Sequence, residues 1–62
     1  MTFKELKTTE EYKQSDILEL YYEDGEEVCI VDFDKNNIDD NEVTAVNKSK
    51  TCIGLLEVIL RR

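Results

Sequence analysis

The sequence predicts a small α+β protein in which a short N-terminal helix precedes a four-stranded antiparallel sheet with meander connections. Three observations lead to this fold class. Apolar and polar residues alternate over the middle of the chain, an Asp-Gly pair separates two such runs, and a helix-start pattern lies near the N-terminus. The 62 residues, of which 40% are hydrophobic, suit a single small domain over 1–62 with a modest core.

The helix is expected over residues 8–14. Thr8 is followed three residues later by Glu11, which is the spacing of a capping box, and Thr9 is an alternative N-cap. An earlier helix start, near Thr2, is left open. Acidic residues in the expected first turn suit the helix dipole, so the segment carries several helix-start signals at once.

Two strands, 17–22 and 27–33, are expected to form a hairpin. The Asp-Gly pair at 24–25 is typical of a two-residue turn between antiparallel strands. Such a turn places alternate apolar residues of both strands on one core face. That face comprises Leu18, Leu20, Cys29, Val31 and Phe33.

The second half of the chain is expected to complete the sheet. Residues 34–41 have the composition of a loop, 42–47 that of a third strand and 51–60 that of a fourth. Gly54 marks a bulge or a close backbone approach. The apolar run at 51–60 also suits a short buried helix, because periodicity alone does not separate the two. The N-terminal helix or a second copy of the chain covers the remaining apolar face.

Cysteine and histidine usage argues against catalysis. Cys29 and Cys52 lie in apolar runs and are expected as buried, reduced thiols, with one bridge between them as the alternative. The chain has no histidine and only two glycines, so it lacks a zinc ligand set, the usual general base and a glycine-rich phosphate loop. We therefore expect a protein without enzymatic activity and without a cofactor.

One segment resembles the opening of a calcium-binding loop. Asp32, Asp34 and Asn36 stand at alternate positions, and Asp40 falls at the ninth position of the loop. The pattern then fails, because the twelfth position is Val43 where a bidentate glutamate belongs. A polar loop between strands is the preferred interpretation, and calcium binding is kept as an alternative.

Acidic residues are concentrated in one part of the chain. Between residues 16 and 42 there are eleven acids and one base, Lys35, which gives a formal charge of −10, whereas the remainder carries +3. This segregation produces a strong negative potential over part of a small surface. The potential repels phosphate, so direct nucleic-acid binding there is disfavoured and a basic protein partner is favoured.

The expected partner-binding site is built from these acids and one tyrosine. Tyr21 falls on the outward face of its strand among acids, as expected of an interface anchor. The predicted site comprises Glu19, Tyr21, Glu23, Asp24, Glu26, Glu27, Asp32, Asp34, Asp39, Asp40 and Glu42.

The function expected from this surface is stoichiometric binding. The protein would inhibit or modulate a basic, nucleic-acid-binding protein by mimicking the phosphates of DNA, as an anti-defence or anti-host factor of the phage type does. The alternative is a homodimer that assembles through its sheet and uses its acidity only for solubility. No apolar run is long enough for a signal peptide or a membrane helix, so a cytoplasmic location without a membrane partner is expected.

Overall fold

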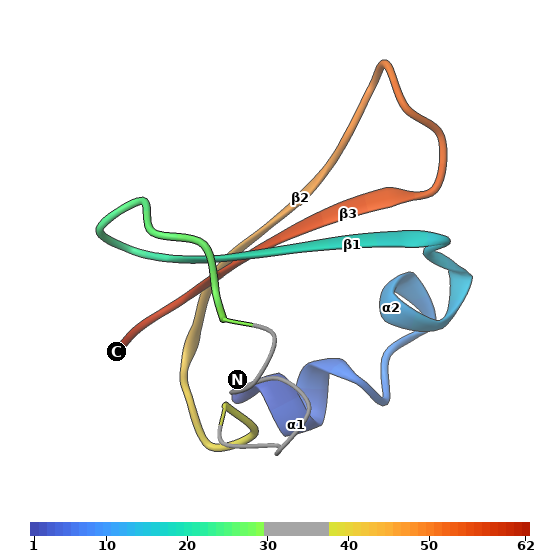
Figure 1. The fold of residues 1–62 in the computed structure, drawn as a ribbon. Helices are drawn as coiled ribbons and strands as arrows, with labels where there is room; N and C mark the ends of the chain where they lie inside the picture. The colour runs from blue at the N-terminus through green and yellow to red at the C-terminus, as the bar shows by residue number, and fades with distance from the viewer. Residues whose placement is uncertain (30–37) are drawn as a thin grey trace.

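The protein forms two layers, a sheet and two short helices, in a computed structural model that describes residues 1–29 and 38–62 (Figure 1). The elements, in chain order, are α1 (Phe3–Leu6), α2 (Glu10–Gln14), β1 (Ile17–Tyr22), β2 (Val43–Lys48) and β3 (Leu55–Leu60). Figure 1 shows both helices on the same side of the sheet. Within the described residues, no helix is long and apolar enough to cross a membrane.

The predicted four-stranded antiparallel meander is wrong. Among the residues that the structure describes, the sheet has three strands in the order β1-β3-β2, and it is mixed, because β3 pairs in parallel with β1 and antiparallel with β2. Five of the six residues of β3 are apolar, which suits a central strand that is flanked on both edges. Burial of this apolar strand decides the order of the strands in the sheet. Hairpin signals in the sequence indicate only the pairing of strands that are neighbours along the chain.

The predicted hairpin turn is displaced by one residue. The loop spans three residues, 23–25, because the Tyr22 amide donates to the Glu26 carbonyl at 2.8 Å and the Gly25 amide donates to the Tyr22 carbonyl at 2.9 Å. Gly25 has a φ of 91°, as expected of the left-handed residue that closes a three-residue hairpin loop. The Asp-Gly signal therefore marks the turn correctly but gives the wrong loop length.

This displacement changes which side chains enter the core. Within the described residues, the loop is followed by an isolated antiparallel bridge between Tyr21 and Glu27. Val28 is consequently buried and Cys29 is exposed, the reverse of the expected arrangement, because a one-residue slip turns each side chain to the opposite face. The remainder of the expected 27–33 strand, from residue 30 onward, lies outside the described residues.

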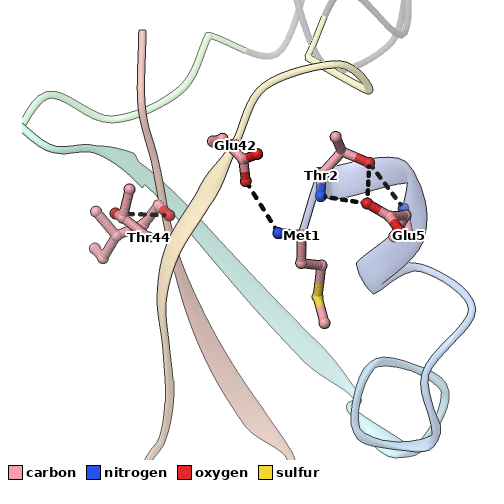
Figure 2. A network of polar contacts seen from close by, with 6 residues as sticks. Met1, Thr2, Glu5, Glu42 and Thr44 are labelled. Carbon is pink, nitrogen blue, oxygen red and sulfur yellow. Dashed lines mark hydrogen bonds and ion pairs between the residues drawn. The ribbon is translucent and has the colours of Figure 1, made fainter.

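Two short helices replace the single helix expected over 8–14. At the first, Thr2 and Glu5 form a capping box, in which the Thr2 amide donates to the Glu5 carboxylate at 2.9 Å (Figure 2). This hydrogen bond is the main cause that lowers the pKa of Glu5 from 4.5. Thr9 caps α2, whereas Thr8 donates to the Glu5 carbonyl instead of capping. The alternative starts at Thr2 and Thr9 are confirmed, and the Thr8 box is wrong.

The core lies between the helices and the inner face of the sheet. Alternate residues of β3 point into it, and α1 contributes its two apolar side chains. The buried set is Phe3, Leu6, Tyr22, Val28, Ile38, Leu56, Val58 and Leu60. Tyr12 of α2 packs against this core with its ring edge-on to that of Phe3, at 6.1 Å between centroids.

The C-terminal segment is a strand, as preferred over a helix, but it begins at Leu55 instead of residue 51. The preceding residues make the turn that leads out of β2, and Cys52 lies in that turn. Both cysteines are free and exposed, so the expectation of buried thiols is wrong, and so is the alternative of a bridge between them. Cys29 is exposed because the displaced hairpin turns it to the opposite face, and Cys52 is exposed because it lies in the turn before β3.

Candidate functional site

The predicted site residues do not form one surface. Asp32 and Asp34 lie outside the described residues, and the others fall into three groups. The tip cluster consists of Glu23, Asp24 and Glu26; the N-terminal group consists of Asp39, Asp40 and Glu42; the open-face cluster consists of Glu19, Tyr21 and Glu27.

The tip cluster is paired with the chain's own C-terminal arginines. Arg62 contacts Asp24 at 3.2 Å and Glu26 at 2.8 Å, and its guanidinium lies 4.1 Å from the centre of the Tyr22 ring. Arg61 reaches the third carboxylate of the cluster at 3.3 Å. These pairs are exposed and contribute little to stability, but they reduce the negative potential at the tip.

The N-terminal group has a structural explanation for two of its three carboxylates. Glu42 accepts from the Met1 ammonium at 3.0 Å (Figure 2), and Asp39 pairs with Lys7 at 2.7 Å. Glu42 also forms an antiparallel bridge with Thr2. Both carboxylates therefore hold the first residues of the chain against the segment that leads into β2.

The sheet face opposite the helices is uncovered by any helix or strand of the described residues. We call it the open face. Strand register places eight side chains on it, of which most are apolar, two are acidic and one is an amide. They are Ile17, Glu19, Tyr21, Ala45, Asn47, Leu55, Glu57 and Ile59. Ile17 is 47% exposed, and the other apolar members are half-buried.

The open-face cluster gains a fourth member, Glu57, from β3. The parallel register sets Glu57 directly opposite Glu19, and the Tyr21 hydroxyl donates to Glu19 at 2.9 Å. Glu27 joins through its bridge with Tyr21, and the Asn47 amide donates to Glu57 at 3.3 Å. The charges of Glu19, Glu27 and Glu57 therefore all act on the Tyr21 phenol, and Glu19 contacts it directly.

The open-face cluster places like charges opposite each other without an ion pair in the described residues. Among the described residues, no lysine, arginine or N-terminal ammonium lies within 4 Å of the carboxylates of Glu19, Glu27 or Glu57. The pKa of Tyr21 is raised, first by its hydrogen bond to Glu19, then by the charge of Glu19, with smaller contributions from Glu27 and Glu57. Like charges directly opposite each other destabilise a sheet. Such departures from local stability rules are expected at functional sites.

Glu57 was missed because its sequence context is apolar. It is the one charged residue of β3, and the acids with which it clusters, Glu19 and Glu27, lie 38 and 30 positions earlier in the chain. An isolated glutamate within an apolar strand was a usable signal. Its partner, however, depends on the parallel pairing with β1, which sequence proximity does not indicate.

A separate hollow of about 350 Å³ lies where the end of α2 meets the turn between β2 and β3. Its lining combines acidic residues, Glu11 and Asp16, with the cation Lys48 and with backbone at Gly54. The Ser49 hydroxyl is already occupied, because it accepts from the Cys52 amide at 3.0 Å. This lining mixes two acids with one cation and does not select for one class of ligand.

The residues of the calcium-loop interpretation between 32 and 36 lie outside the described part of the chain. In the part that is described, no group of three or more histidine, cysteine or acidic residues is arranged to hold a metal ion. Comparison with known proteins gives no family for this chain, since no family model, no curated protein and no solved structure matches it.

Proposed function

We propose that this protein acts by stoichiometric binding to a basic surface of another protein, without catalysis. The observation that carries the proposal is the position of Glu19 and Glu57. They lie opposite each other beside Tyr21, with no cation near them in the described residues, on a face of the sheet that is partly apolar. A basic partner would supply the missing positive charge, and the apolar neighbours would exclude water from the contact.

A second copy of the chain is the other candidate for this face, because Ile17, Leu55 and Ile59 lie on it. Packing two open faces together would bring six carboxylates of two clusters into one interface. Like-charge juxtaposition across an interface costs several kcal/mol. The charge distribution therefore favours a basic partner over face-to-face homodimerisation.

A nucleic-acid-binding protein is the proposed class of partner. Such proteins carry basic surfaces that neutralise phosphates, and an array of carboxylates on a rigid sheet can occupy the same surface. The net charge of −7 supports this class and would speed association with a positively charged target. In this role the protein would be a cytoplasmic inhibitor or modulator of its target.

The proposal is tested by affinity capture with the tagged protein, followed by elution in salt steps and, separately, with added DNA. We expect a basic protein that is released by both treatments, because salt screens the ion pairs and DNA competes for the same surface. Recovery of the protein's own copies alone would contradict the proposal and favour the homodimer. A captured partner that resists both salt and DNA would also contradict it.

A further inference from the structure

We infer that the partner docks on the open face of the sheet, and not at the hairpin tip, and that it does so through an amphipathic basic segment whose arginine bridges Glu19 and Glu57. This inference rests on the proposed function, since it names the surface and the chemistry of the binding event. It makes Glu57, a residue outside the acidic part of the sequence, the central contact.

The first support is the geometry of the two carboxylates. Adjacent strands lie about 4.8 Å apart, and Glu19 and Glu57 are direct neighbours across β1 and β3 on the same face. An arginine guanidinium presents a planar fork of five N–H donors, which can reach both carboxylates at once. A lysine ammonium is a single charged point and is less suited to this pair.

The second support is the apolar surface around the pair. Leu55 and Ile59 flank Glu57 on the same face of β3, and Tyr21 and Ile17 flank Glu19 on β1. Apolar side chains that alternate with arginine in the partner would cover these residues. Covering them removes water from the ion pairs, which strengthens each charge-assisted hydrogen bond.

The third support concerns the tip cluster, which already has its cations. Arg62 lies between Asp24 and Glu26 and stacks on Tyr22, and Arg61 pairs with Glu23. A basic partner would have to displace these side chains before it could bind there. The open face has no such competitor among the described residues, so cations of a partner should contribute more binding free energy there.

The test uses a short synthetic peptide in which arginine and leucine alternate, titrated into the ¹⁵N-labelled protein. We expect amide shifts at residues 17–21 and 55–59. The double variant Glu19→Gln/Glu57→Gln should bind the peptide about tenfold more weakly, as expected when charge-assisted hydrogen bonds are lost. The matched control Glu10→Gln/Glu11→Gln removes the same charge from α2, away from the face, and should bind as the parent protein does.

The outcomes separate this inference from the function on which it rests. Shifts confined to residues 22–26, with full affinity in the Glu19/Glu57 double variant, would overturn the docking surface and leave the basic partner in place. No binding of the arginine peptide at concentrations on the order of 1 mM would overturn the docking inference, whereas the proposed function is decided by the affinity capture. A dimer would also overturn the inference if sedimentation shows it to form without peptide and if its formation shifts the amides of residues 17–21 and 55–59. The peptide with glutamate in place of arginine should not bind.

Discussion

Glu57 occupies a position at which an apolar side chain would be more stable. Its neighbours on the same face of β3, Leu55 and Ile59, are apolar and half-buried, and its cross-strand partner on β1 is another glutamate. The Tyr21 hydroxyl donates to Glu19 and so accommodates part of the local negative charge. Within one chain, this arrangement has a cost in stability and no compensating ion pair among the described residues.

The titration of Tyr21 reports directly on this cluster. Its pKa is raised from 10.0 because its neighbours stabilise the neutral phenol and repel the phenolate. The corresponding contribution to stability is therefore fully present below pH 10 and is lost as the pH rises through the raised pKa. Replacing Glu19 with glutamine should lower the pKa of Tyr21 towards its ordinary value.

The measurement is the ultraviolet absorbance of phenolate during an alkaline titration. Subtracting the titration of Tyr21→Phe isolates the contribution of Tyr21 from those of the other tyrosines. If Glu19→Gln left the midpoint of Tyr21 unchanged, the hydrogen bond between the two side chains would not be the main cause of the raised pKa.

The turn that leads into β3 aligns this strand with β1. Gly54 has a φ of 87°, and its carbonyl accepts from the Asp16 amide at 2.8 Å and from the Ile17 amide at 3.0 Å. These bonds join the start of β1 to the start of β3, where the parallel register begins. The close approach expected of Gly54 from the sequence is therefore observed, at the end of the sheet where it sets the register.

Gly54→Ala and Gly25→Ala form a matched pair of variants. Both place a side chain at positive φ, which costs about 1–2 kcal/mol for a left-handed residue. An added Cβ at Gly25 meets nothing within 4 Å, whereas at Gly54 it would lie 2.8 Å from an Asp16 carboxylate oxygen and 3.2 Å from the Asp16 Cβ. Gly54→Ala should therefore be the more destabilising change in urea unfolding. Equal losses would show that the Asp16 contact is relieved without cost.

Among the clustered carboxylates of the described residues, two kinds differ in their ion pairing. Those of the tip cluster, together with Asp39 and Glu42, meet a cation of the same chain, and those of the open face do not meet one within the described residues. The carboxylates of the first kind form ion pairs within the folded chain, so their presence needs no partner. The second kind raises the free energy of the isolated chain and would be relieved by a partner.

Removing an open-face charge should consequently stabilise the free protein. We expect Glu57→Gln to raise the free energy of unfolding by about 0.2–1 kcal/mol, the range for cross-strand pairs. Added salt should stabilise the parent protein more than this variant, because it screens the same repulsion. The control Glu42→Gln loses its ion pair with the Met1 ammonium, so its free energy of unfolding should not increase. Chemical denaturation at low and high salt checks this, and a destabilised Glu57→Gln would contradict it.

Sequence reasoning identified acidic residues and an outward Tyr21, but it did not indicate how the structure groups them. The acidic segment and the outward Tyr21 led to Glu19 and Glu27, which do lie together. Sequence alone did not indicate that Arg61 and Arg62 reach the tip cluster from the C-terminus, or that Glu57 joins the open face. These contacts join residues far apart in the chain, and charge counting along a sequence contains no distances between them.

Local sequence was sufficient for the strand at 17–22 and for a turn around Gly25, because turns depend on neighbouring backbone and side-chain groups. For the helix starts it offered Thr2 and Thr9 only as alternatives to the preferred Thr8. Strand order and direction were not encoded locally. They follow from burying the apolar β3 in the centre of the sheet, and this free energy is gained only when distant segments meet. That long-range burial placed Glu57 opposite Glu19 and so created the open-face cluster.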